Sequence, residues 1–211
     1  MNSLDTRAPR GASAVSFPGE ELILVDADDR EIGYSSKLAA HRGPGQRHRA
    51  FSVFLFDDQQ RLLIHRRSVH KPLWHGFWTN SCCSHPRRGE ALEDSVHRRL
   101  REELSCEVNR LERVCAFEYH ASFGNAGSEH ELCHVYLAGL ASGARVQGHE
   151  LEIAELEWVA IERVDSMMRE ARSDLTPWFR EEWALLRGPH AVQFESFLAA
   201  SGGGSDMPHC A

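Results

Sequence analysis

A single amphipathic helix set among strand-like segments is the feature that most constrains the fold of this chain. Over residues 90–104, the apolar residues Leu92, Val96, Leu100 and Leu104 recur every four positions and form one stripe. Charged residues fill the rest of that helix. Strand patterns lie on both sides of it and helical patterns follow, which predicts a sandwich of helices and sheet in the α/β (or α+β) class.

Alternating apolar patterns bounded by turn residues predict the strands, and longer periodic patterns predict the helices. We expect strands at residues 21–25, 31–34, 51–56, 62–67, 77–79, 113–123, 131–140 and 156–161, with further helices at 162–171, 177–187 and 190–199. The segments 51–56 and 62–67 flank a polar turn and are expected to pair as a hairpin.

The length and the ends of the chain predict one domain. The 211 residues suffice for a single sizeable core. Residues 1–19 are polar, contain Gly, Pro and Ala, and are expected to form a disordered N-terminal extension. Residues 201–211 (SGGGSDMPHCA) are expected to form a flexible tail. The folded domain is therefore expected at residues 20–200.

Charge and cysteine content exclude several classes of protein. A net charge of −7 argues against a nucleic-acid partner, because phosphate backbones require a broad basic surface. No apolar run approaches the roughly 20 residues of a membrane span, and the N-terminus lacks the apolar core of a secretory signal. The six cysteines, two of them adjacent, indicate free thiols in a reducing compartment. We expect a cytoplasmic protein that is a monomer or weak dimer.

Three histidines and two glutamates form a candidate metal site. His41 and His48 lie seven residues apart across a Gly/Pro turn, so a folded loop can bring their imidazoles together. Glu129 and Glu131 alternate along a strand, and a divalent cation would neutralise the repulsion between their carboxylates. With His85 they make a five-ligand set that suits zinc, manganese or iron rather than magnesium alone. The alternatives are solvated loop histidines and an acidic strand end, and spacing does not show convergence.

A cysteine lies beside the third histidine of that set. Cys83 precedes His85 by two residues, so both side chains point to one face of an extended segment. One of them can bind a metal while the other meets a substrate. Buried structural cysteines are the alternative explanation.

A local basic set stands out in this acidic chain. It consists of Lys37, Arg66, Arg67 and Lys71. Arginine can bind phosphate oxygens in bidentate fashion, and lysine supplies a point charge. Because Arg66 and Arg67 follow a strand, we expect only one of them to face a site. A role in surface solubility is the alternative.

The central helix resembles a Nudix box, in which helix carboxylates hold Mg²⁺ on a diphosphate. The matching carboxylates are Glu90, Glu102 and Glu103. The box is degraded, since Ser84 and Ser105 replace glycines and Arg98-Arg99 replaces the usual Arg-Glu pair. The missing glutamate predicts that diphosphate is bound without being cleaved. A surface helix with i,i+4 salt pairs is the alternative.

The order and spacing of all these elements resemble the type I isopentenyl-diphosphate isomerases, a family with the Nudix fold. The resemblance runs from about Glu21 to Trp183 and rests on KLAAH…RHRAFSVFLF, RRSVHKPLWHGFWTNSCCSHP, GEALEDSVHRRLREEL, the EHE triplet and TPWFREEW. It implies a Nudix-like α/β/α sandwich with a mixed sheet. It also implies an isomerase of isoprenoid biosynthesis, which converts isopentenyl diphosphate to dimethylallyl diphosphate through a carbocation-like intermediate.

The resemblance further implies a role for each matching residue. The ligands of one divalent metal, Mn²⁺ or Zn²⁺, would be His41, His48, His85, Glu129 and Glu131. Glu103 would hold Mg²⁺ against the diphosphate, and the substrate would be bound by Lys37, Arg67, Lys71, Arg99 and Trp183. Cys83 and Glu131 would be the catalytic acid and base, with Tyr119 as the hydrogen-bonding partner of Glu131. Cys82 offers a second thiol, and only spacing selects Cys83.

Two other functions stay open at this point. A Nudix hydrolase of a nucleoside diphosphate derivative would share the fold and the need for Mg²⁺. The degraded box and the His/Cys/Glu set argue against it. The second alternative is a binding module without catalytic activity. Against it, every proposed acid, base and ligand position holds a residue that can fill that role.

Overall fold

Strand β3 (His48–Phe56) lies inside the sheet and contributes side chains to the core on both of its faces. The computed structural model describes residues 15–17, 19–170 and 172–201, so most of the expected N-terminal extension and C-terminal tail lies outside the described residues. Phe51, Val53 and Leu55 point to one face of the sheet and pack under helix α2 (Leu92–Leu104). Phe54 and Phe56 point to the other face. Because both faces are covered, β3 is an almost continuous apolar run rather than an alternating one.

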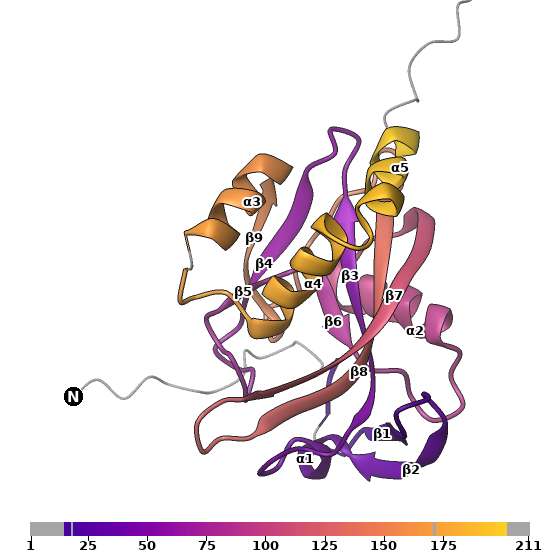
Figure 1. Ribbon diagram of the computed structural model, residues 1–211, viewed down its shortest axis with the longest axis vertical. Helices are drawn as coiled ribbons and strands as arrows, with labels where there is room; N and C mark the ends of the chain where they lie inside the picture. Colours follow the sequence, from indigo (N-terminus) through magenta and orange to yellow (C-terminus); the bar gives the residue numbers. More distant parts are fainter. Residues whose placement is uncertain (1–14, 18, 171, 202–211) are drawn as a thin grey trace, which may run out of the picture.

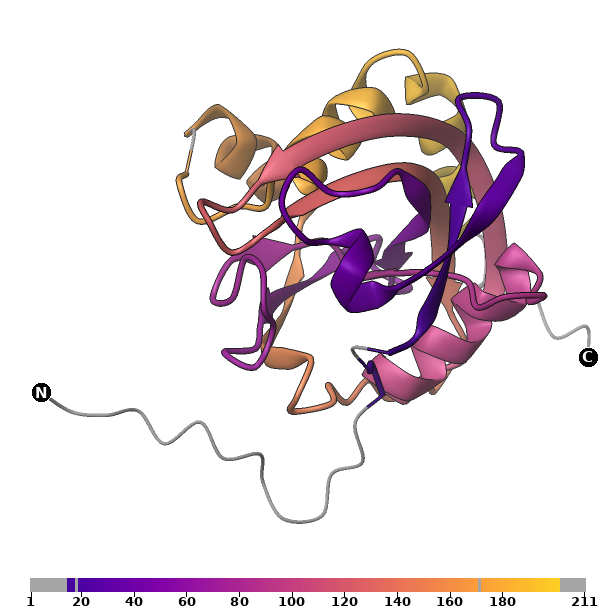
Figure 2. The same ribbon diagram turned by 90° about the horizontal axis from the view of Figure 1, so that it is seen from below.

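Three helices cover the second face of the sheet. They are α3 (Ile161–Arg169), α4 (Pro177–Arg187) and α5 (Ala191–Ser201). α4 and α5 contribute Trp178, Phe179 and Phe194 to the core around Phe54 and Phe56, and α3 contributes Val164 and Met167. Figures 1 and 2 show α4 and α5 on one side of the sheet and α2 on the other. The predicted α/β/α sandwich in one domain is therefore confirmed.

The sheet is mixed, as the resemblance implied. Strand β8 (Ser128–Leu140) runs parallel to β3 and pairs with it from His48↔Glu131 to Phe56↔Gly139, while β7 (Val108–Ser122) runs antiparallel to β8. Three strands share the other edge of β3, namely β1 (Glu21–Val25), β6 (Cys82–Ser84) and β4 (Leu62–Arg67). The sheet is completed by β2 (Glu31–Ser36), β5 (Trp78–Thr79) and β9 (Ile153–Val159).

The prediction that residues 51–56 and 62–67 pair as a hairpin is wrong except next to the turn. β3 and β4 pair only at Phe56↔Leu62. Strand β6 occupies the position beside β3 at residues 51–53, and β4 pairs along its length with β9 instead. Local sequence predicts the turn, but the competing partners are distant in the chain. This insertion carries Cys83 into the sheet.

For the other elements, most boundaries lie within a few residues of the expected positions. The strand expected from residue 113 begins at Val108, and the short helix α1 (Lys37–Ala40) was not expected. Ser105 ends α2 in the left-handed conformation, with φ of 52°, where glycine is the common residue. Among the residues described, no helix has both the length and the apolar character needed to cross a membrane.

Candidate functional site

The three histidines and two glutamates of the predicted metal set converge at one end of β3 and β8. His41 ends α1, His48 begins β3, His85 follows β6, and Glu129 and Glu131 lie in β8. Their ligand atoms all lie within 4.8 Å of one another. His85 Nε2 is 3.0 Å from Glu131 Oε1, and His41 Nε2 is 2.7 Å from Glu129 Oε2. Three segments that are distant in the chain, residues 41–48, residue 85 and residues 129–131, thus form one cluster.

The donor set fits a divalent cation. His41 Nδ1 lies 2.7 Å from the carbonyl oxygen of Lys37, and His48 Nδ1 lies 2.7 Å from that of Gln46. When each Nδ1 donates to its carbonyl, each Nε2 presents a lone pair to the cluster. The Nε2 atoms of His48 and His85 lie only 3.1 Å apart, and the buried His85 Nδ1 has no partner. A cation between these nitrogens and the carboxylates would relieve the crowding of lone pairs and negative charge.

The protonation states of Glu129, Glu131 and His85 match those of metal ligands. Burial alone would raise the pKa of Glu129 and of Glu131, but the neighbouring histidines outweigh burial and both pKa values are lowered. Burial, followed by the charges of Lys37 and His48, holds the pKa of His85 well below its ordinary value. The cluster therefore offers ionised carboxylates and a neutral imidazole, the forms that bind metal.

A glycine in the β7–β8 turn permits this convergence. Gly127 has φ of 151°, and a Cβ at this position would collide with the carbonyl oxygen of His41. The next residue, Ser128, donates its backbone N–H to that same oxygen at 3.0 Å. The close approach of the two backbones holds the loop that carries His41 against β8, which carries Glu129 and Glu131.

The thiol of Cys83 and the carboxylate of Glu131 lie on strands that flank β3. Cys83 pairs with Ser52, and its Sγ donates to Asn80 Oδ1 at 2.9 Å and lies 3.3 Å from Ser52 Oγ. Burial raises the pKa of the Cys83 thiol, which is therefore protonated at neutral pH. On the other side of β3, Tyr119 Oη donates to Glu131 Oε2 at 2.7 Å.

The geometry separates the two adjacent thiols. Strand alternation turns Cys82 into the core under α2, where it is fully buried near Phe51 and Val96. Cys83 instead packs against the core that contains Tyr119. The histidine of the EHE triplet also points away from the cluster, because His130 Nε2 lies 2.9 Å from Glu118 Oε1.

A second cluster of charges adjoins the metal set. Arg99 is almost fully buried, and its Nε donates to Glu103 Oε1 at 2.8 Å. Lys71 Nζ lies 2.6 Å from Glu152 Oε2, and Arg99 Nη2 lies 3.8 Å from Glu152 Oε1. Burial, followed by the charges of Lys71 and Arg99, lowers the pKa of Lys37 to about 8. Three predicted diphosphate-binding cations thus lie close to the predicted magnesium ligand.

Only one of the two consecutive arginines faces inward, as the strand pattern predicted. Arg66 is exposed and pairs with Glu155 at 2.8 Å. Arg67 is buried, and its Nε and Nη2 donate to the carbonyl oxygen of Leu73 at 3.3 and 3.0 Å. Its guanidinium lies 5.3 Å from the ring centre of Trp178.

The structure brings Trp178, rather than the expected Trp183, to the other candidate residues. Trp178 lies in the first turn of α4, with its ring centre 6.0 Å from that of Tyr119 and its Nε1 bonded to Thr79 Oγ1 at 3.0 Å. Trp183 lies more than one helical turn further along α4. Its ring stacks on Phe54 in the core, and its Nε1 donates to Asp165 Oδ1 at 2.8 Å.

Two buried glutamates belong to this region and were not predicted. Glu152 lies among the cations described above, and no local pattern separates it from the other acidic residues of its segment. Glu182 lies on α4 and is fully buried near Cys133, with its Oε2 unpartnered. Its signal was available, since the helical period places it on the same face as Trp178, Phe179 and Leu186.

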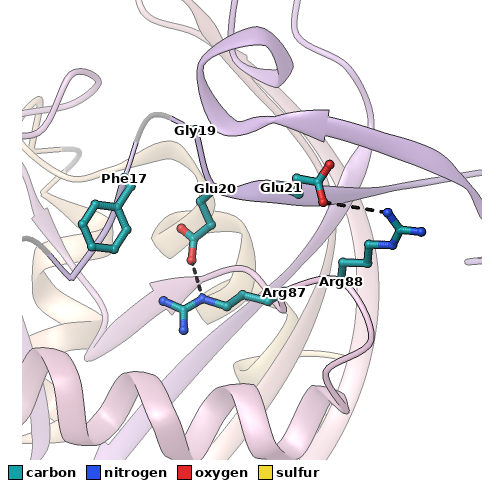
Figure 3. Close-up of a pocket in the computed structure, with 6 residues that line it drawn as sticks. All are labelled: Phe17, Gly19, Glu20, Glu21, Arg87 and Arg88. Carbon is teal, nitrogen blue, oxygen red and sulfur yellow. Dashed lines mark hydrogen bonds and ion pairs between the residues drawn. The ribbon is translucent and has the colours of Figure 1, made fainter.

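A surface pocket of 510 Å³ lies beside the charge cluster (Figure 3). Its lining includes two arginines, but Arg87 Nε lies 3.0 Å from Glu20 Oε1 and Arg88 Nη1 lies 4.0 Å from Glu21 Oε2. Because both arginines already face carboxylates, this pocket is a poor anion site. The buried clusters are therefore the stronger candidates for a functional site.

Comparisons with known proteins agree with this fold and site. A sequence model described as NUDIX domain matches residues 46–179. A crystal structure of a Deinococcus radiodurans protein superimposes with a TM-score of 0.62 at 25% identity, and covers 77% of this chain and 96% of its own. The MutT protein from Methanosarcina mazei Go1 reaches a TM-score of 0.50 at 14% identity over 74% of this chain and 96% of its own, which shows the fold alone. These matches define a Nudix-domain protein.

Curated relatives narrow that class. The chain is 43% identical over 162 residues to an isopentenyl-diphosphate Delta-isomerase of Burkholderia multivorans, with 76% of this chain and 89% of the relative covered. Relatives with the same name from Klebsiella pneumoniae subsp. pneumoniae and Mycolicibacterium vanbaalenii are each 40% identical, over 80% and 79% of this chain and 88% and 91% of their own length. The chain therefore belongs to the isopentenyl-diphosphate Delta-isomerase family.

Proposed function

We propose that this chain catalyses the 1,3-allylic rearrangement of isopentenyl diphosphate to dimethylallyl diphosphate. The observation that carries the proposal is the setting of Glu131. One of its oxygens accepts a hydrogen bond from Tyr119, and the other lies 3.0 Å from His85 Nε2, while the Cys83 thiol lies across β3. Family membership supports the same activity.

The reaction requires an acid and a base on either side of a flat alkene. An isolated alkene is a poor base, so a positioned proton donor must protonate one carbon while a positioned base removes a proton two carbons away. Cys83 and Glu131 supply a thiol and a carboxylate on strands that flank β3. Tyr119 fixes the orientation of the carboxylate. We propose that these two residues exchange protons with the substrate.

The intermediate resembles a tertiary carbocation and must be kept from water. Trp74 and Trp178 are both buried, and their rings meet edge to face at 5.1 Å. The π face of a desolvated indole attracts positive charge, worth about 2 kcal/mol. We propose that Trp178 lies beside the hydrocarbon of the substrate, in the place expected for Trp183.

The five-carbon group offers little binding area, so the diphosphate must supply most of the affinity. We propose that Lys37, Lys71 and Arg99 bind it, with Arg67 nearby. Mn²⁺ or Zn²⁺ held by the His/Glu cluster would adjust the proton affinity of Glu131, and Mg²⁺ held by Glu103 would neutralise diphosphate charge. We further propose a cytoplasmic location, which the free cysteines of the described residues support.

Proton NMR of isopentenyl diphosphate incubated with the purified protein and Mg²⁺ in D₂O tests this proposal. We expect dimethylallyl diphosphate to form with deuterium in its new methyl group, because the added proton comes from a group that exchanges with solvent. Unchanged isopentenyl diphosphate together with phosphate release from a panel of nucleotides would instead identify a Nudix hydrolase.

A further inference from the structure

Glu152 stands at the centre of the charge cluster, although nothing in the local sequence marks it. Its Oε2 lies 2.6 Å from Lys71 Nζ, and its Oε1 lies 3.8 Å from Arg99 Nη2. Lys37 is also close enough for its charge to stabilise the carboxylate. The three cations that we assign to diphosphate binding therefore share one carboxylate.

This carboxylate is ionised and held in place by its backbone. Burial would raise the pKa of Glu152, but Lys71 and Arg99 outweigh burial and lower it to about 2. The backbone of Glu152 bonds to Ser68 and His149, and His149 N–H donates to the carbonyl oxygen of Glu103 at 2.8 Å. These bonds tie Glu152 both to the segment that carries Lys71 and to the helix that carries Arg99.

A fixed negative charge at this place is unexpected for a site that only binds an anion. Lys37 Nζ lies 4.0 Å from Glu20 Oε2, and Arg99 Nη1 lies 3.1 Å from Glu102 Oε2. Lys71 and Arg99 also face the carboxylates of Glu103 and Glu152, so the three cations do not outnumber the carboxylates around them. Free diphosphate carries several negative charges and would be repelled by both carboxylates at short range. A bound Mg²⁺ cancels most of that charge and is attracted by the same carboxylates.

We propose that Glu152 makes the diphosphate site select the magnesium complex of its ligand over the free diphosphate. This inference rests on the proposed function, because it assumes that the cluster binds diphosphate. It assigns Glu152 a role in specificity, as a positioning residue for Lys71 and Arg99 whose negative charge also acts on the bound ligand. A purely structural ion pair would hold the lysine but would not discriminate between the two ligand forms.

Calorimetry tests this inference by measuring the binding of inorganic diphosphate in the presence and in the absence of Mg²⁺. The protein is first loaded with Mn²⁺ or Zn²⁺ at the His/Glu cluster, and no chelator is present. The quantity of interest is the ratio of Kd without Mg²⁺ to Kd with Mg²⁺. In Glu152→Gln we expect this ratio to fall at least about tenfold, because repulsion of the free anion is lost together with attraction of the magnesium complex. Glu152→Asp keeps the charge and should keep the preference.

Glu150→Gln is the matched control, because Glu150 is exposed on the same segment, and its ratio should equal that of the wild type. An unchanged ratio in a folded Glu152→Gln protein would overturn the inference and leave the proposed function intact. Wild-type protein that binds diphosphate in neither condition would overturn both. If Glu152→Gln fails to fold, the double variant Lys71→Gln/Glu152→Gln is compared with Lys71→Gln. These two proteins differ only in the charge at residue 152, and we expect the same fall in the ratio of Kd without Mg²⁺ to Kd with Mg²⁺.

Discussion

The two adjacent thiols of β6 show how one residue step determines chemistry in a strand. Cys82 points into the apolar core under α2, whereas Cys83 bonds to Asn80 and lies near Ser52. Both thiols are kept protonated by burial. Only Cys83 lies on the side of the sheet that holds Tyr119, so the two cysteines should differ sharply on substitution.

We expect Cys83→Ala and Glu131→Gln each to lower kcat by about 10²–10⁴-fold or more, the usual contribution of a positioned acid or base. Turnover is followed by proton NMR, and circular dichroism verifies the fold. Cys82→Ala is the control for Cys83→Ala and should retain activity at some cost in stability, because its thiol fills a core position. Near wild-type turnover by Cys83→Ala would show that the acid/base assignment is incorrect.

Glu182 should make the stability of the protein depend on pH. Burial raises the pKa of its carboxyl from 4.5 to about 8. Between these two values the unfolded chain loses the proton and the folded chain keeps it, so stability falls as pH rises and levels off above about pH 8. Glu182→Gln cannot ionise, and it should gain stability relative to the wild type across this window.

Urea unfolding at pH 5 and pH 8 measures this effect. The expected difference between Glu182→Gln and the wild type grows by a few kcal/mol between the two pH values, at about 1.4 kcal/mol for each unit of pKa difference. Glu181→Gln changes the exposed neighbour and should show a much smaller change. Parallel pH profiles for Glu182→Gln and the wild type would contradict the prediction.

At the level of elements, the β7–β8 turn is a positioning device for the metal cluster. Gly127→Ala should push the loop that carries His41 away from β8, because the added Cβ meets the carbonyl oxygen of His41. We expect the affinity for the clustered metal to fall about 10–100-fold, as for other changes that disturb ligand orientation. Competition with a chelator of known affinity measures it.

The same turn contains the matched control for this substitution. Gly124 also has positive φ, at 55°, but a Cβ there meets nothing within 4 Å. Gly124→Ala should therefore cost backbone strain without loss of metal affinity. Equal metal affinities for the two variants would refute the role assigned to Gly127.

Local patterns predicted the elements well and their partners less well. The period of the central helix and the alternation of Glu129 and Glu131 are local, so the helix and the shared face of the carboxylates were predictable. The pairing of β6 with β3 depends on residues far apart in the chain, and no local pattern specifies it. Glu152 was missed for the same reason, because its cationic neighbours come from other elements.

The two tryptophans of α4 show a related limit of local patterns. Trp178 and Trp183 share the buried face of α4, and helical periodicity treats them alike. The start of α4 at Pro177 places only Trp178 near β5 and Tyr119. Tertiary packing determines which end of a helix lies next to a site, and the helical periodicity of the sequence does not.

At the scale of the whole molecule, the clustered metal should act on both activity and stability. We expect exhaustive chelation to abolish turnover and metal readdition to restore it. The melting temperature should fall by roughly 5 °C or more without metal, because a cation that binds only the folded state stabilises it by mass action. His130→Ala, which changes the histidine bonded to Glu118, should retain metal and activity. Full activity after complete metal removal would contradict the prediction.

The parallel pairing of β3 with β8 has a consequence for how this protein comes into being. His48 and Glu131 are neighbours in the sheet but are separated by two-fifths of the chain, and closing so long a connection is slow and entropically costly. A nascent chain on the ribosome can form the β1–β2 hairpin early, yet it cannot capture its cation until residue 131 has emerged. Cation uptake during synthesis would therefore mark the pairing of β8 with β3, and truncation before β8 leaves three histidines with no carboxylates to meet.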